Sequence, residues 1–478
     1  TLELTVENKG QVAAPFPLVV QRDTQVLQTH WIDGFTGRKT IELPLAERAT
    51  HVHIDPDHTT LDLYRHDNLM RTRGILRKAR PLRPSLLWHL ESDEYAFVNW
   101  VPVLSWDRYD GLMPGLGLYN AIDPPRPYEW QLVPQWSVRQ HELVGMARLQ
   151  RHWWWRSGPV RQLTLGWSGR TYHYFENAAW QYTLRYARQG LFLRLAFRQK
   201  PPTSLFRHQL DAAWTWIHEE QARFDTLGNF TGKAWARRPV ARLVWTGSNR
   251  RPINPWSLQL GLEGSRLDYF QQTHRYVRLW LEGRFAYTYA SKRHLAARLF
   301  VGTFLHNTAA QRGFILPGAW NLTAQGFNDY AYDRFFADRW ADSGLWSRQI
   351  AMAEGGMKVA LGPAYLQGQS NRLVVALNLE ADLPKKLPLG LAIKPYFDLG
   401  YYEGAGIFQP DDWRDNLWWQ GGLMLDMLGK QLKLYLPLIN SDNLEMLYDQ
   451  SGRSTVWSRL VWTVPFETYD PWRLREEF

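Results

Sequence analysis

Apolar and polar side chains alternate at every second position over most of this chain. Among the clearest runs, leucine, valine, alanine or phenylalanine recurs on one side at 191–197, 277–285, 295–301, 373–379 and 432–438. Successive side chains of a β-strand point to opposite faces, so this period predicts strands and not helices. About 18 such runs of roughly 9–14 residues lie between residues 94 and 478. The pattern therefore predicts an all-β protein.

The first 60 residues show shorter runs. They fall at 2–6, 16–21, 25–32, 39–43 and 50–54, and are separated by turn residues such as Gly10, Asp23 and Pro44. This spacing predicts a small, partial antiparallel β-sandwich over 1–60. The next stretch, 61–93, is rich in arginine and contains Pro81 and Pro84. We interpret it as a basic linker, with the second domain at 94–478.

Full charges occupy the polar face near the middle of the longer strands. A soluble sandwich also alternates, but a transmembrane barrel requires an apolar outer face, a polar lumen and no open edge in hydrocarbon. We therefore predict an antiparallel transmembrane β-barrel of roughly 16 strands, with 14–18 plausible and even numbers favoured. The side chains predicted to face its lumen are Arg194, Arg278, Glu282, Arg284, Arg298 and Arg372.

Tryptophan is the outlier of the composition, with 26 residues in 478. Many lie near the ends of predicted strands, where barrels carry aromatic girdles at the two water–lipid boundaries. The alternative is core packing in a soluble all-β protein, which would require two apolar faces to meet. The predicted girdle comprises Trp100, Trp106, Trp130, Trp136, Trp180, Trp256, Trp418 and Trp457. The terminal Phe478 is also typical of bacterial outer-membrane barrels.

Composition and charge narrow the function classes. The chain has no cysteine, which excludes disulfides, thiolate zinc sites and a cysteine nucleophile. No run of 18 apolar residues is present, so membrane-spanning helices are excluded. Residues 1–25 do not resemble a signal peptide. The formal net charge of +10 is assigned to lumen and headgroup arginines, and no nucleic-acid partner is expected.

Candidate catalytic and metal motifs are weak. His218-Glu219 begins like the H-E-x-x-H zinc motif, but Ala222 stands where the second histidine is needed. His51, His53 and Asp55 share one strand face, which is either a metal site or a solvent-facing edge. We predict no catalytic, cofactor-binding or metal-binding residue in this chain.

A long connection, 306–347, contains four aspartates interleaved with aromatic residues. We expect it to be a folded loop and not a linker. The aspartates either chelate calcium or solvate a helical segment over 329–342, and glycine is missing where an EF-hand needs it. Solvation is the favoured interpretation. These residues are Asp329, Asp333, Asp338 and Asp342.

Several loop motifs resemble those of a known family. In the first 60 residues they are Asn8-Lys9-Gly10, Val12-Ala13-Ala14-Pro15-Phe16-Pro17, Trp31-Ile32-Asp33-Gly34-Phe35 and Ile54-Asp55-Pro56. Further along they are Tyr109-Asp110-Gly111, Gly117-Leu118-Tyr119-Asn120, Asp329-Tyr330-Ala331-Tyr332-Asp333 and Glu354-Gly355-Gly356-Met357-Lys358. The chain resembles the C-terminal region of membrane alanyl aminopeptidase-like metallopeptidases (gluzincins) from Bacteroidota: the post-catalytic β-sandwich and a long region interpreted as a barrel.

That resemblance implies where the chemistry lies. The family's H-E-x-x-H and G-x-M-E-N motifs, and its zinc, belong to a domain upstream of this sequence, so this chain alone should be inactive. Its implied role is an integral bacterial outer-membrane barrel that anchors and orients that peptidase domain, with a lumen that binds or passes peptides. Thr1 would then begin the C-terminal part of a longer polypeptide. Expected partners are outer-membrane lipid and lipopolysaccharide, the upstream peptidase domain or fragment, and peptides.

Two other functions stay open at this point. The first is a stand-alone outer-membrane porin or transporter without peptidase activity. The second is a soluble all-β carbohydrate-binding or hydrolytic protein.

Overall fold

The structure is a computed structural model, and it describes residues 1–10, 12–62, 65–89, 92–120, 125–269, 272–309, 317–383, 392–404, 412–427 and 432–464. These residues form two compact units. The first comprises residues 1–101 and 118–126, and the second comprises 102–117 and the residues from 127 onward. Within the described ranges, no helix is both long enough and apolar enough to cross a membrane.

The first unit contains the predicted β-sandwich. One sheet pairs β1 (Leu2–Asn8) with β4 (Gly37–Leu43), and the other has the order β3 (Gln25–Ile32), β2 (Phe16–Arg22), β5 (His51–Ile54), β6 (Leu69–Arg71). All five strands expected between residues 2 and 54 are present. Their alternate apolar residues meet in one core that includes Leu4, Leu18, Val20, Ile41 and Val52. A short 3-10 helix, η1 (Arg65–Asp67), precedes β6.

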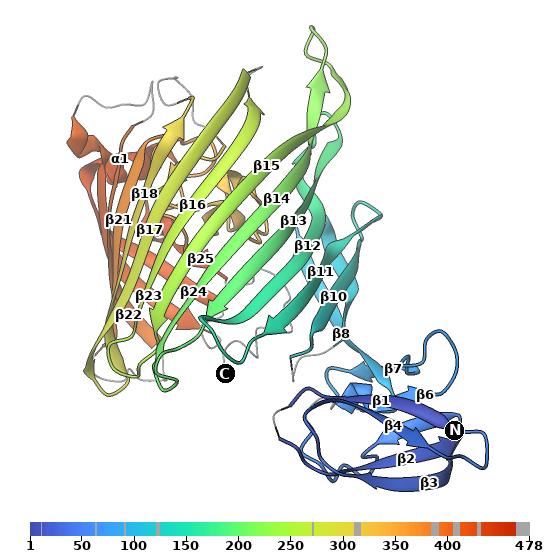
Figure 1. Ribbon diagram of the computed structural model, residues 1–478. Helices are drawn as coiled ribbons and strands as arrows, with labels where there is room; N and C mark the ends of the chain where they lie inside the picture. Colours follow the sequence, from blue (N-terminus) through green and yellow to red (C-terminus); the bar gives the residue numbers. More distant parts are fainter. Residues whose placement is uncertain are drawn as a thin grey trace. The chain divides into compact units, whose positions relative to one another are not determined.

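Seventeen of the described strands form a closed barrel (Figure 1). From β10 the ring runs in chain order to β18, continues through β21 to β25, and closes through β7, β8 and β9. The strands are β7 (Leu82–Leu86), β8 (Ala96–Asp107), β9 (Gly111–Tyr119), β10 (Tyr128–Ser137), β11 (Glu142–Trp154), β12 (Val160–Asn177), β13 (Tyr182–Phe197), β14 (Phe206–Phe224), β15 (Phe230–Asn249), β16 (Trp256–Tyr269), β17 (Gln272–Ala290), β18 (Arg293–Asn307), β21 (Leu373–Ala381), β22 (Ala392–Tyr402), β23 (Leu417–Met427), β24 (Leu432–Asn440) and β25 (Val461–Thr463).

The predicted barrel is confirmed, and its strand number lies within the expected range. The number is odd, however, whereas even numbers were favoured. A ring with an odd number of strands cannot reverse direction at every step, and β7 indeed pairs with β8 in parallel. Both β6 and β7 lie within 61–93, the range interpreted as a linker: β6 pairs with β5, and β7 pairs with β8.

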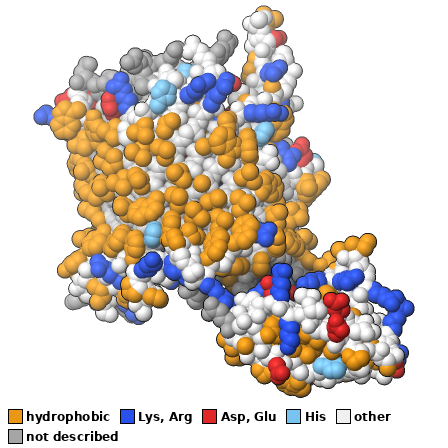
Figure 2. Space-filling view, viewed as in Figure 1, with side chains coloured by type: hydrophobic (Ala, Val, Ile, Leu, Met, Phe, Trp, Pro, Cys, Tyr) orange, Lys and Arg blue, Asp and Glu red, His pale blue; other side chains and the backbone are white. Residues whose placement is uncertain are grey.

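The alternation seen in the sequence separates the two faces of the barrel wall. On β17, Leu281 and Phe285 are 37% and 43% exposed, while Arg278 and Glu282 on the opposite face are buried. Figure 2 shows the result: apolar side chains cover the wall of the barrel as a broad band, and lysine and arginine gather beyond both margins of that band. Burial of this band in hydrocarbon would satisfy its apolar surface.

The connection between β18 and β21 returns into the barrel. We call residues 317–372 the plug segment. It contains β19 (Trp320–Asn321), η2 (Gly326–Asn328), η3 (Trp346–Arg348) and β20 (Gln369–Ser370). Its Leu322 and Met357 are fully buried and share one apolar cluster with Val374 and Tyr402 of the wall. The expected folded loop is confirmed, but 329–342 consists of turns and bends and is not helical.

The chain leaves β24 through the one α-helix of the described residues, α1 (Asp442–Gln450), followed by η8 (Val456–Arg459). A further 3-10 helix, η6 (Trp413–Asn416), precedes β23. Apolar residues alternate from Val456 to Val464, but within the described residues of this stretch the strand is limited to β25. The physical reason is that Arg459 is buried in a salt bridge with Glu445 of α1, and Thr455 caps η8. Phe478 lies outside the described residues.

Candidate functional site: the charged interior of the barrel

The interior is lined by ion pairs between wall strands and the plug segment. The largest group centres on Glu263 of β16, which is 1% exposed. Arg278 of β17 donates from Nε to Glu263 Oε1 at 2.9 Å and from Nη2 to Tyr330 Oη at 2.7 Å. Tyr276 donates to the same carboxylate oxygen at 2.9 Å. A buried carboxylate with this many charged and neutral donors is fully compensated, as a buried charge must be.

A second plug residue, Asp333, lies between two wall arginines. Its Oδ1 accepts from Arg188 Nη2 at 2.7 Å, and its Oδ2 accepts from Arg242 Nη1. Burial alone would raise the pKa of the Asp333 carboxyl, but the Arg242 and Arg188 charges outweigh burial and hold that pKa well below its ordinary value. Asp333 is therefore ionised over the whole physiological pH range.

The β17–β18 side of the wall holds the plug through Arg298. Its Nη2 donates to Glu282 Oε2 at 2.7 Å and to the carbonyl oxygen of Glu354 at 2.6 Å, and its Nη1 donates to Asn378 Oδ1 at 2.9 Å. Gly356 lies directly against this guanidinium. Its φ is +63°, and a Cβ placed there would lie 2.6 Å from Arg298 Nη1. Only glycine fits this close approach without strain.

A fully buried ion pair completes the contacts on β22. Lys358 of the plug places Nζ 2.7 Å from Asp398 Oδ1, and both side chains are 0% exposed. Asn378 and Gln420 donate to the same carboxylate at 2.9 and 3.0 Å. The lysine also faces the rings of Tyr396 and Tyr435, at 5.3 and 5.5 Å.

Most of the aspartates of the connection are not arranged as predicted. Asp329 and Asp338 are 6% and 5% exposed and do not solvate the loop. Asp329 pairs with Arg339 at 3.0 Å, and Asp338 accepts from Arg108 at 2.8 Å. The favoured solvation interpretation is wrong for Asp329, Asp333 and Asp338, whose carboxylates are neutralised by arginines, whereas Asp342 is exposed. Within the described residues, no group of three or more histidine, aspartate or glutamate side chains is arranged to hold a metal ion.

The residues predicted to face the lumen fall into two sets. Arg278 and Arg298 are buried and bind the plug segment, and Glu282 is buried beside Arg298. The others are more exposed: Arg194 binds Asp211 at 2.6 Å, and Arg284 binds Glu282 at 2.6 Å. Arg372, directly before β21, binds Glu403 at 2.6 Å.

The tryptophans predicted as a girdle also divide. Trp106, Trp136, Trp180 and Trp457 are 40%, 47%, 43% and 72% exposed, and Trp100, Trp130 and Trp256 are half-buried. The prediction for Trp418 is wrong. It is 2% exposed, and its ring packs against Tyr402 at 5.5 Å inside the barrel. The reason is that side chains alternate along β23, and Trp418 lies on the same strand face as the buried Gln420 and Met424.

The histidines of β5 are engaged within the first unit. His53 Nε2 lies 2.7 Å from Asp93 Oδ2, and His58 Nε2 lies 3.2 Å from the same oxygen. Asp55 accepts hydrogen bonds from the backbone and hydroxyl groups of Thr59 and Thr60. Asp93 thus binds His53 and His58, and Asp55 binds Thr59 and Thr60. These contacts account for the polar side chains of this motif.

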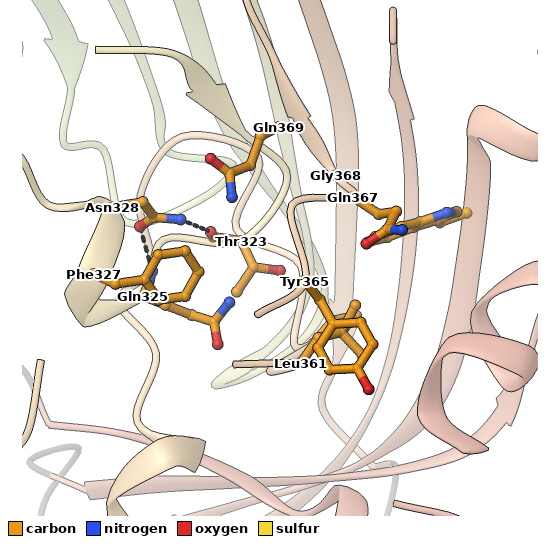
Figure 3. Close-up of a pocket in the computed structure, with 11 residues that line it drawn as sticks. Thr323, Gln325, Phe327, Asn328, Leu361, Tyr365, Gln367, Gly368 and Gln369 are labelled. Atoms are coloured by element: carbon orange, nitrogen blue, oxygen red, sulfur yellow. Dashed lines mark hydrogen bonds between the residues drawn. The ribbon is translucent and has the colours of Figure 1, made fainter. Parts of the chain in front are cut away.

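Two of the hollows formed by the described residues lie inside the barrel. A small one within the plug has a volume of about 10 Å³, space for one water molecule (Figure 3). Asn328 braces it by donating to the Thr323 carbonyl at 3.2 Å and accepting from the Gln325 amide at 2.8 Å (Figure 3). The larger cavity measures about 330 Å³ and lies between β11–β14 and Asp333 of the plug. Only the second is large enough for a small ligand.

Several interior residues were not predicted from the sequence, namely Arg188, Arg242, Glu263, Lys358 and Asp398. A signal for the wall residues was present, since Glu263 and Asp398 lie within alternating runs, on the polar face. For the plug residues no local signal exists, because their partners are distant in the chain.

Comparison with known proteins finds only distant similarity to solved structures. No protein-family model matches the chain, and no curated protein matches it. Among solved structures, BamA from Haemophilus ducreyi lacking POTRA domains 1–3 aligns with 11% identity and a TM-score of 0.38, covering 74% of this chain and 70% of that one. The outer membrane transporter YddB from Escherichia coli aligns with 9% identity and a TM-score of 0.24, covering 71% of this chain and 56% of that one. The assignment of the fold rests on the strand order of the structure itself, which is a closed barrel.

Proposed function

We propose that this chain is an integral outer-membrane barrel that anchors and orients a zinc aminopeptidase-like domain preceding it in a longer polypeptide. The observation that carries the membrane part is the apolar outer face of the wall. Leu191, Leu281 and Leu299 lie on three different strands and are 49%, 37% and 44% exposed, each with charged or buried neighbours on the opposite face. Exposing such a band to water costs about 25 cal/mol of free energy per Å² of apolar surface.

The filled interior supports an anchor over an open pore. The plug segment binds β13, β15, β17, β18 and β22 through salt bridges or charged hydrogen bonds, which lie on widely separated sides of the ring. Charged pairs in a water-poor interior are strong only when every partner is in place. Passage of a peptide or solute would require these contacts to open.

The sandwich supplies the other element of the proposal. Its edge strand β3 exposes Val26 and Trp31 at 53% and 67%. Exposed aromatic residues of this kind are enriched where proteins bind each other. We assign this edge to the contact with the preceding peptidase-like domain, which would carry the zinc and its ligands.

The membrane part is tested with single-cysteine spin labels, because the chain has no cysteine of its own. Leu281→Cys and Leu299→Cys should be accessible to oxygen and shielded from a water-soluble nickel complex in lipid vesicles. Leu227→Cys is the matched control; it lies in the β14–β15 turn, is 85% exposed and should show the reverse. Nickel accessibility at positions 281 and 299 would refute membrane insertion.

The anchoring part is tested on the gene. An upstream reading frame that continues through Thr1 and encodes H-E-x-x-H and G-x-M-E-N motifs supports it. A signal peptide that directly precedes Thr1 would refute it and favour the alternative, a stand-alone porin or transporter. The cavity of about 330 Å³ is the observation that favours this alternative.

A further inference from the structure

The larger interior cavity is lined by an excess of positive charge. Four arginines line it, one from β11, one from β12 and two from β13: Arg148, Arg170, Arg188 and Arg194. Two carboxylates oppose them, Asp211 of β14 and Asp333 of the plug segment. Counting four positive and two negative side chains leaves a formal charge of +2 on the lining.

Both carboxylates already have arginine partners. Asp211 accepts from Arg194 at 2.6 Å and from Gln209 at 2.7 Å. Asp333 is shared between Arg188 and Arg242, and Arg242 is not part of the lining. Both carboxylates are thus engaged with arginines other than Arg170, whose hydrogen bond to the plug goes to a backbone carbonyl.

Two of the arginines face each other directly. Arg170 of β12 and Arg188 of β13 are partners in the strand register. Like charges at opposed positions destabilise a strand pair. Each guanidinium makes one hydrogen bond to the plug, to the Tyr332 carbonyl and to Asp333, while the buried Nε atoms of both make none. An anion in the cavity would relieve the repulsion between these side chains.

The lining also offers an apolar surface. The ring of Phe192 lies beneath the Arg148 guanidinium, 4.9 Å from ring centroid to Cζ, and Met146 lines the same cavity. Stacking on an aromatic ring holds the plane of a guanidinium in place. The cavity thus combines an anion-binding wall with room for a small organic group, which is the usual composition of a ligand site.

We propose that this cavity binds a small phosphate monoester, with its dianionic group held between Arg170 and Arg188 and its organic part against Phe192. Arginine forks suit phosphate oxygens because they donate two parallel hydrogen bonds. A dianion matches the +2 lining, whereas a single carboxylate leaves half of it uncompensated. The proposal goes beyond the anchoring role and holds whether or not a peptidase domain precedes the chain.

The test is calorimetric titration of the full chain in detergent, in a phosphate-free chloride buffer. Glycerol 1-phosphate is the probe, and inorganic phosphate and acetate are titrated separately. Glycerol 1-phosphate should bind at one site, inorganic phosphate more weakly, and binding should weaken as salt rises. A micelle-soluble phosphatidic acid separates the two sources of a phosphate monoester. If only the lipid binds, or acetate binds as well as glycerol 1-phosphate, the proposal is wrong.

Variants make the result specific to the cavity. Arg170→Gln should weaken binding by about tenfold, the loss expected for one charge-assisted hydrogen bond. Arg284→Gln is the matched control, since it removes an inward arginine that is not part of the cavity lining. Asp211→Asn should tighten binding, an effect that misfolding cannot imitate. Equal affinities for all these variants and the unmodified chain would overturn the proposal.

Discussion

Lys358 and Asp398 form an ion pair with 2.7 Å between Nζ and Oδ1, and neither side chain has any exposed surface. The lysine belongs to the plug segment and the aspartate to β22 of the wall, so this contact joins the filling of the barrel to its wall. Asn378 and Gln420 supply further donors to the carboxylate. Such a pair is costly to break from one side because the partner is left buried and charged.

We predict that Lys358→Met destabilises the barrel by about 3–5 kcal/mol, the usual result of orphaning a buried charge. The double variant Lys358→Met/Asp398→Leu should recover most of the loss because it leaves no unpaired charge. The measurement is guanidinium unfolding in detergent, followed by heat-modifiable gel migration. Arg139→Gln is the control: it removes an exposed pair with Glu176 and should cost less than about 1 kcal/mol. If the double variant is as unstable as the single one, ion pairing is not what holds the plug here.

Gly356 and Gly344 allow a test of close packing at the plug. Both have positive φ, +63° and +75°, but a Cβ at Gly356 would meet Arg298 at 2.6 Å, whereas nothing lies within 4 Å of a Cβ at Gly344. Gly344→Ala should therefore cost only the backbone strain, about 1 kcal/mol. Gly356→Ala should cost clearly more and should also displace Arg298. The two unfolding curves, measured side by side, decide the matter, and equal losses would contradict the close contact.

The wall of the barrel was predictable from sequence because strand geometry is local. Alternation placed Arg278, Glu282 and Arg298 on the polar face, and all three are buried in the structure. The plug was not predictable, since Asp333 meets Arg188 and Arg242 at separations of 145 and 91 residues. A local sequence pattern does not indicate contacts between residues so far apart in the chain. Asp333 was therefore predicted to be a solvated loop residue.

The girdle shows a second limit of sequence reasoning. Trp418 and Trp419 are adjacent, so only one of them can face outward on a strand. Their side-chain chemistry is identical and does not decide which. The structure turns Trp418 inward, and Trp419 stacks against the outward Phe397, with ring centroids 6.4 Å apart. Gly368 of the plug lies against the inward ring, and its lack of a side chain leaves room for Trp418.

The sandwich should lose stability in acid through Asp55. Burial raises the pKa of this carboxyl, but the hydrogen bonds from Thr59 and Thr60 outweigh burial and lower the pKa to about 2, from an ordinary value of 3.8. A carboxyl whose pKa is lower in the folded than in the unfolded protein stabilises the fold at pH values above its unfolded-state pKa. This stabilisation is lost as the pH falls through the folded-state pKa. The loss, about 2 kcal/mol, should therefore develop between about pH 4 and pH 2.

Hydrogen exchange of peptides covering residues 51–60, corrected for intrinsic rates, measures this change in the full chain. In Asp55→Asn, exchange of the same peptides should be faster at pH 5 and nearly independent of pH between 4 and 2. An Asn variant that keeps the full pH dependence would show that another group titrates.

Finally, the two classes of tryptophan should respond differently to truncation. Trp418 is 2% exposed and packs against Tyr402, so Trp418→Ala should open a cavity and cost about 3–5 kcal/mol. Trp136 on β10 is 47% exposed on the outer face, so Trp136→Ala should change the unfolding free energy in detergent by less than about 1 kcal/mol. In lipid vesicles Trp136→Ala should insert more slowly, because an interfacial anchor is lost. Guanidinium unfolding in detergent and gel-shift kinetics of insertion separate the two effects. If Trp136→Ala destabilises the detergent-bound barrel as strongly as Trp418→Ala, the assignment of Trp136 to the lipid boundary is wrong.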